Sequence, residues 1–380
     1  MKRIKSNKIV LDNSLFDGYI YFEDGKITDL TVKEYPVSEE YDYTNLYVSA
    51  GFIDIHTHGG GGYSFSDELE DVIMGCNFHL AHGTTSICPT VSAAEIEYMA
   101  RATENIKQAM SDPRVKGTVI GAHLEGPYLS RNQAGAQCAD FIGPPRESDY
   151  IPVMKKYGDA IARWSYAPEN DRDEKFAKAL KEYGIVSSAG HTDAVYDDLM
   201  RAAKHGCRLI THLYSCTSTI TRDHGFRRLG VIETAYLSDD IYVEIICDGK
   251  HLPTELIKLI YKIKGANKIA LVTDSLPLAG TDRTHGFMQN TEYIIEDGVC
   301  KLVDRSAFAG SIATADRLVR VAVNDAEIPL TDAVKMMTAT PAKIMNLSQK
   351  GTIEQGKDAD FAVFDKNINI KSVFVKGKSV

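Results

Sequence analysis

Long apolar runs, paired cysteines and an excess of basic residues are all missing from this chain of 380 residues. No stretch approaches the roughly 18 uninterrupted apolar residues of a membrane helix, and the N-terminus does not resemble a signal peptide. The seven cysteines are scattered with no Cys-x-x-Cys pair, a pattern typical of reduced thiols in a cytoplasm. The formal net charge of −9 argues against nucleic acid as a partner but not against a small anion. The sequence therefore predicts a soluble, cytoplasmic protein that binds neither nucleic acid nor membranes.

The two ends of the chain share one pattern and the middle has another. Residues 1–50 and 346–380 alternate apolar and polar residues around turn signals such as Asp24-Gly25, which indicates β-strands that form one small β domain. Residues 51–345 alternate short apolar segments with helical periodicity, which favours a (β/α)8 barrel of the α/β class over a doubly wound open sheet. The expected strands are 51–56, 84–89, 117–123, 160–166, 185–190, 208–212, 241–247 and 268–274. A hairpin is expected within 280–308, followed by closing helices at 311–323 and 330–345.

Polar residues able to bind a metal stand where five of these strands end. On a barrel, the carboxyl ends of all the strands open onto one face, where catalytic groups collect. His56 and His58 are two residues apart, so on a strand both imidazoles leave from the same face and can converge on one cation. The other four strands end at Glu125, at His191, at His212 and at Asp274, which is well placed as a general base. Each of these residues alone could be an ordinary core or surface residue, but their coincidence predicts a metal centre.

Further residues on this face are candidates for holding the substrate. His251, in "DGKHL" after the seventh strand, is expected to contact the substrate. Arg222 and Arg227 follow the sixth strand, and one of them could bind a phosphate bidentately; the alternative is a solvated loop or a dimer contact. The four glycines at 59–62 lack the spacing of a nucleotide-binding loop, so we expect an ordinary turn there.

These residues stand in motifs that resemble a known family. "GFIDIHTHG", "HLEGPYL", "AGHT", "THLY", "DGKHL", "VTDS" and "AGSIATADRLVR" occur in the order and spacing of the N-acetylglucosamine-6-phosphate deacetylases of the amidohydrolase superfamily. The resemblance implies a metal-dependent deacetylase of amino-sugar catabolism, dimeric, with a distorted barrel and a small β-sandwich. It also implies that Glu125, His191 and His212 hold the principal metal and that His56, His58 and Glu125 hold a second. One or two divalent ions, zinc or iron, are expected, with Asp274 as acid and base.

Three departures from the family pattern fall on residues that are expected to contact the substrate. Ser215 and Cys216 replace an Asn-Ala pair, Gln137 replaces a histidine, and the loop that carries Arg222 and Arg227 is rewritten. The substrate is therefore expected to be N-acetylglucosamine 6-phosphate or a close relative, such as its galactosamine epimer. The alternative is another amide hydrolase, a cyclic-amide hydrolase or a deaminase of the superfamily. Against cyclic-amide hydrolysis, the fourth strand ends in "WSYAPE", without the metal-bridging lysine common in those enzymes.

Overall fold

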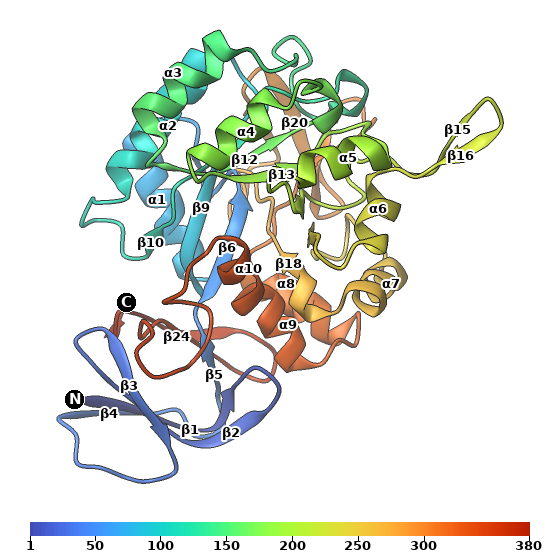
Figure 1. Cartoon of the computed structure of the whole chain (residues 1–380). Coiled ribbons are helices and arrows are strands. Elements are labelled where there is room, and N and C mark those ends of the chain that lie inside the picture. Colours follow the sequence, from blue (N-terminus) through green and yellow to red (C-terminus); the bar gives the residue numbers. More distant parts are fainter.

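Eight parallel strands form a nearly closed barrel at the centre of the chain (Figure 1). The computed structural model describes all residues, 1–380. Around the barrel the strands follow chain order: β6 (Phe52–Thr57), β9 (Thr84–Ser92), β11 (Ala122–Glu125), β12 (Ile161–Tyr166), β13 (Val186–Ala189), β14 (Leu209–Ile210), β17 (Tyr242–Ile245) and β18 (Ile269–Leu271). A short β10 (Thr118–Val119) also pairs with β9. Each barrel strand overlaps one of the predicted strands, so the barrel prediction is confirmed and the open sheet is excluded.

The first and last strands meet through backbone hydrogen bonds. The amide of Asp274 donates to the carbonyl of His56, and the amide of His58 donates to the carbonyl of Ser275, both at 2.9 Å. These contacts lie at the carboxyl ends of β6 and β18. They bring the two histidines of the H-x-H motif beside Asp274.

Helices surround the barrel on its outer side (Figure 1). They are α1 (Leu69–Leu80), α2 (Ile96–Ala109), α3 (Glu147–Tyr157), α4 (Lys175–Glu182), α5 (Tyr196–Ala203), α6 (Val231–Leu237), α7 (Thr254–Lys264), α8 (Ala315–Asn324), α9 (Leu330–Met337) and α10 (Ala339–Ile344). In α2, for example, Met99, Ala102, Ile106 and Ala109 are buried, which is the spacing of one helical face. Three single turns of 3-10 helix also occur, at Arg131–Gln133, Pro168–Asn170 and Ala266–Lys268.

The second predicted closing helix is divided into two. Residues 330–345 form α9 and α10, which are separated at Thr338, whose φ of −133° and ψ of −80° are not helical. Pro341 lies in the first turn of α10. Proline has no backbone N–H and its ring clashes with the carbonyl four residues earlier, so it is tolerated at a helix start but not inside a helix.

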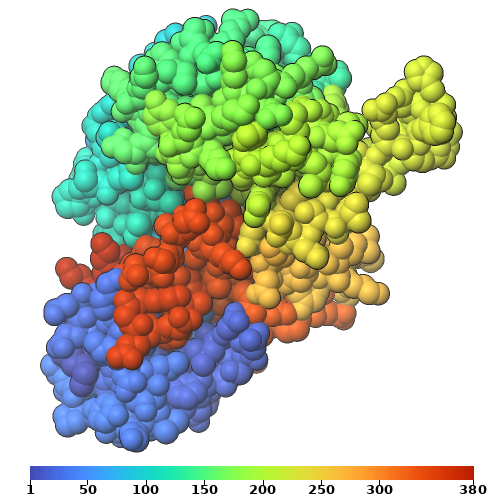
Figure 2. All heavy atoms as spheres, viewed as in Figure 1, coloured from blue at the N-terminus to red at the C-terminus, as the bar shows by residue number.

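Strands from both chain ends form one mixed sheet, which confirms the prediction that the two ends meet in one β structure. The order is β25-β24-β23-β5-β1-β2-β3, and β4 pairs with β1. The N-terminal strands are β1 (Lys2–Val10), β2 (Leu15–Glu23), β3 (Lys26–Thr31), β4 (Glu39–Asp42) and β5 (Tyr47–Ala50); the C-terminal strands are β23 (Phe361–Phe364), β24 (Ile370–Val375) and β25 (Lys378–Ser379). Antiparallel pairing of β5 with β23 joins the two ends, which lie together at the base of the molecule (Figure 2). The exact domain limits, 1–50 with 346–380 and 51–345, stay a prediction.

Three smaller β elements stand near the carboxyl ends of the barrel strands. Segment 280–308, predicted as a hairpin, belongs to a four-stranded antiparallel sheet: β19 (His285–Met288), β20 (Thr291–Glu296), β21 (Val299–Leu302) and β22 (Phe308–Gly310). The glycines form a turn with β7 (Gly59–Gly60) and β8 (Tyr63–Ser64), and a Cβ on Gly60 would lie 2.5 Å from the Phe78 ring of α1. The turn therefore packs against a helix. The third element, β15 (Thr221–Asp223) with β16 (Phe226–Arg228), is a hairpin arm that projects from the body (Figure 1).

Candidate metal centre

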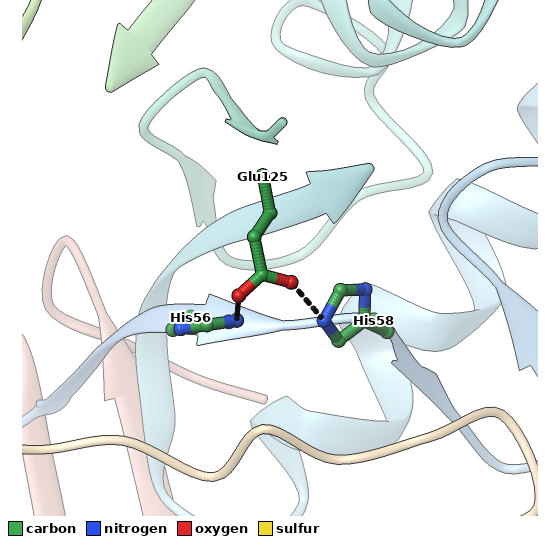
Figure 3. A group of neighbouring side chains, drawn as sticks. All are labelled: His56, His58 and Glu125. Carbon is green, nitrogen blue, oxygen red and sulfur yellow. Dashed lines mark ion pairs between the residues drawn. The ribbon is translucent and has the colours of Figure 1, made fainter. Parts of the chain in front are cut away.

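Four imidazoles converge on the carboxylate of Glu125, which is 1% exposed. The Nε2 atom of each histidine lies near a carboxylate oxygen: His212 at 2.9 Å, His58 at 3.2 Å, His191 at 3.3 Å and His56 at 3.4 Å. Figure 3 shows Glu125 above β6, with one oxygen facing His56 and the other facing His58. The structure thus brings together all five of the predicted metal ligands.

Asp274 lies beside the same cluster. Its Oδ1 atom is 3.2 Å from His58 Nε2 and 3.5 Å from His56 Nε2. Burial would raise the pKa of Asp274, but the neighbouring charges of His56 and His58 outweigh burial and hold the pKa below its usual value. The carboxylate is therefore ionised at neutral pH and able to accept a proton.

Three residues of the cluster have strained backbone conformations. His191, His212 and Asp274 have φ values of 46°, 28° and 45°, and each lies within three residues of the end of a barrel strand. Residues with a Cβ seldom adopt this left-handed region, and holding one there costs roughly 1–3 kcal/mol. Such strain persists where the surrounding structure imposes it, and it is concentrated at functional sites.

Hydrogen bonds to the other ring nitrogen orient three of the histidines. His191 Nδ1 donates to the carbonyl oxygen of Gln133 at 2.8 Å, so its Nε2 carries no proton in the neutral ring. His58 Nδ1 pairs with the Ser92 hydroxyl at 3.0 Å, and His56 Nδ1 faces a carboxylate oxygen of Glu244 at 3.3 Å. Partners of this kind fix the tautomer and the ring direction of metal-binding histidines.

The cluster fits a divalent cation. His56 Nε2 is buried and has no hydrogen-bond partner. The ligand atoms of His56, His58 and Glu125, and those of Glu125, His191 and His212, lie within 4.8 Å of one another in each group. Burial would lower the pKa of His56, but the carboxylates of Glu125 and Asp274 raise it to about 10, so the site favours positive charge. Imidazole and carboxylate ligands suit zinc and iron alike.

A cavity of about 250 Å³ opens beside the cluster. Four of the residues predicted to contact substrate line it: Gln137, Ser215, Cys216 and His251. Tyr214 and, from the four-stranded sheet, Met288 and Phe308 also line it. Arg222 and Arg227 do not line this cavity; both are exposed on the hairpin arm. No lysine or arginine of the same chain lines it.

Two of the lining residues are held by buried partners. Gln137 donates to Glu125 Oε2 at 2.8 Å and accepts from the amide of Ala93 at 2.8 Å, so it fixes the direction of the Glu125 carboxylate. His251 Nδ1 lies 2.9 Å from Asp248 Oδ2. Asp248 is 1% exposed, and although burial raises its pKa, the hydrogen bond from His251 holds that pKa below its usual value.

Sequence reasoning missed the supporting residues, among them Ser92, Gln133, Asp248 and Glu244. Glu244 carries the clearest signal that was available, because a carboxylate in the middle of the apolar run "YVEIIC" needs a buried partner. The histidines that Ser92, Gln133 and Asp248 contact are known only once the fold is known.

A barrel that gathers imidazoles and carboxylates at its strand ends is the architecture of the metal-dependent amidohydrolases. The profile of the amidohydrolase family matches residues 47–380. The chain is 32% identical to the N-acetylglucosamine-6-phosphate deacetylase of Haemophilus influenzae, over 87% of this chain and 86% of that protein. It is 30% identical to the N-acetylgalactosamine-6-phosphate deacetylase of a Shewanella species, over 89% and 84%.

The fold gives the same answer. The crystal structure of N-acetylglucosamine-6-phosphate deacetylase from Pasteurella multocida superposes with a TM-score of 0.93 at 28% identity, covering 100% of this chain and 99% of that one. The chain therefore belongs to the amidohydrolase family, in its branch of N-acetylglucosamine-6-phosphate deacetylases.

Replacing the central carboxylate tests the metal centre. In Glu125→Gln the amide keeps the shape of the side chain but loses the charge shared by all four imidazoles. We expect the affinity for zinc to fall by at least about 100-fold, as measured by zinc content after dialysis against a chelator. The exposed Glu182→Gln is the control. Zinc retained by Glu125→Gln as firmly as by the control would contradict this assignment.

Proposed function

We propose that the protein hydrolyses the acetamido group of N-acetylglucosamine 6-phosphate or its galactosamine epimer, yielding acetate and the hexosamine 6-phosphate. The observation that carries this proposal is the complete set of converging side chains, four histidines around Glu125 with Asp274 beside them. Relatives that act on each epimer resemble the chain to a similar extent, so family membership supports the reaction and leaves both sugars as substrates.

Two cations would share Glu125 in this centre. Glu125, His191 and His212 would hold one, and His56, His58 and Glu125 would hold the other. Zinc or iron suits these ligands. A divalent cation bound here supplies Lewis acidity, which lowers the pKa of bound water and polarises a carbonyl oxygen.

Asp274 is the group that moves protons. It is 8% exposed at the cavity wall and ionised at neutral pH, so it can take a proton from the attacking water. The amine must be protonated to leave, and Asp274 can return that proton to the nitrogen as the C–N bond breaks. His251, held by Asp248, and the segment Tyr214–Cys216 line the cavity and would contact the sugar.

The phosphate of the substrate needs a cation that the cavity of one chain lacks. On the arm, Arg222 and Arg227 stand directly opposite each other across β15 and β16. Like charges in that position repel unless an anion lies nearby. Phe226, at 77% exposure, gives the same arm an apolar contact surface. We therefore propose a homodimer in which the arm of one copy brings an arginine to the phosphate bound by the other.

The proposed compartment is the cytoplasm. All seven cysteines are free thiols and five of them are buried, which fits a reducing environment. None of the helices has the length and apolar character needed to cross a membrane.

An acetate-release assay on a panel of N-acetyl sugar phosphates tests the reaction. The zinc-loaded or iron-loaded protein should release acetate from one or both 6-phosphates. Asp274→Asn should lower kcat by about 10²–10⁴-fold while keeping its metal, because only the proton-accepting oxygen is lost. The exposed Asp304→Asn is the control. Absence of acetate from every member of the panel, with metal bound, would refute the proposal, and full activity in Asp274→Asn would remove that residue from its role.

The arm is tested by Arg227→Ala and Arg222→Ala. In the variant that lacks the phosphate-binding arginine, a charged hydrogen bond is lost. KM for the 6-phosphate should then rise by about 10–100-fold, while KM for the unphosphorylated sugar stays unchanged. Arg228→Ala on the same arm, where Arg228 pairs with Asp223, is the matched control. If KM for both sugars responds equally in each variant, the phosphate is bound elsewhere.

A further inference from the structure

A buried ion pair lies in the barrel beneath the metal centre. Arg163 on β12 and Glu244 on β17 are both fully buried and contact each other through Arg163 NH1 and Glu244 Oε1. Arg163 NH1 also donates to the carbonyl of Ile55 at 3.0 Å, and NH2 donates to the hydroxyls of Ser188 and Thr211 at 3.0 and 3.1 Å. Taking two charges out of water is costly, and apolar residues in such a place are often at least as stable. We therefore expect the ion pair to have a role other than stabilising the barrel.

The second oxygen of Glu244 points toward the metal ligands. Oε2 lies 3.3 Å from His56 Nδ1 and 3.3 Å from the backbone amide of His212. A carboxylate that contacts a guanidinium is ionised and can only accept hydrogen bonds. His56 Nδ1 must then carry the proton of the neutral ring. The bare Nε2 lies 3.4 Å from Glu125 and 3.5 Å from Asp274.

We propose that Glu244, oriented by Arg163, is a positioning residue that fixes the tautomer of His56 and thereby sets the affinity of the cation held by His56, His58 and Glu125. This inference rests on the two-cation centre of the proposed function. The other oriented ligands use neutral partners, a backbone carbonyl for His191 and a hydroxyl for His58. Only His56 depends on a charged acceptor, so its half of the centre is the sensitive one.

Glu244→Gln would reverse the tautomer with almost no change of volume. Arginine has donors only, so Arg163 would keep the amide oxygen of the new side chain and turn its NH2 group toward His56. That NH2 group can only donate, so it would require a bare Nδ1 and place the ring proton on Nε2. A protonated Nε2 cannot bind a cation.

Zinc stoichiometry measures the effect directly. Wild-type protein and Glu244→Gln would be loaded with zinc, titrated with a chelator and analysed for zinc per chain by atomic emission. We expect two zinc ions in the wild type, and in Glu244→Gln one retained ion and one whose affinity is lower by about 10–100-fold. Asp171→Asn is the matched control, because Asp171 is a buried carboxylate that accepts from the amides of Phe176 and Ala177, away from the centre. It should bind like the wild type.

A double variant separates positioning from general damage and serves also if Glu244→Gln does not fold. In Arg163→Met with Glu244→Gln no unpaired charge is buried, and the freed amide can rotate so that its oxygen accepts from His56 Nδ1. The second zinc ion should return. Two zinc ions of wild-type affinity in Glu244→Gln, or one ion in the double variant, would overturn the inference. Fewer than two ions in the wild type would instead overturn the two-cation centre, and this inference with it.

Discussion

The contact between Glu125 and four imidazoles is the interaction on which this end of the barrel depends, because the carboxylate on β11 links histidines from three other strands. Its oxygens face His56 and His58 from β6, and His191 and His212 from beyond β13 and β14. Gln137 donates a hydrogen bond to the same carboxylate and holds it in place. A carboxylate this deeply buried stays ionised only when positive charge lies beside it. Without a cation, the buried carboxylate raises the free energy of the folded protein. A bound cation removes that cost, so the cluster binds a cation strongly.

The structure keeps this cluster in place with features that do not favour stability on their own. His191, His212 and Asp274, which line the cavity, have left-handed backbone conformations. Directly beneath, the Arg163–Glu244 pair fills the barrel with charge where apolar side chains would pack. Strained backbone and buried charge of this kind are the features expected where function, and not stability, determines the residue. The small sheet β19–β22 lines the cavity with Met288 and Phe308.

Much of this arrangement could be predicted from the sequence, because strand ends of a parallel barrel open on one face. The apolar pattern alone places six residues at strand ends: His56, His58, Glu125, His191, His212 and Asp274. Pro341 also indicates the break between α9 and α10, because proline is disfavoured inside a helix, but the break was not predicted. The direction of the arm could not be predicted, because the number of residues between a strand end and Arg222 does not determine the direction in which the loop extends. The partners of the histidines, such as Gln133 and Glu244, come from distant parts of the chain and become neighbours only in the fold.

We propose above that Glu125 joins two cation sites. Diffraction from crystals of the zinc-loaded protein, collected on both sides of the zinc absorption edge, tests it most directly. We expect two anomalous peaks next to Glu125, one beside His56 and His58 and the other beside His191 and His212. A single peak beside His191 and His212, or none within reach of Glu125, would contradict it.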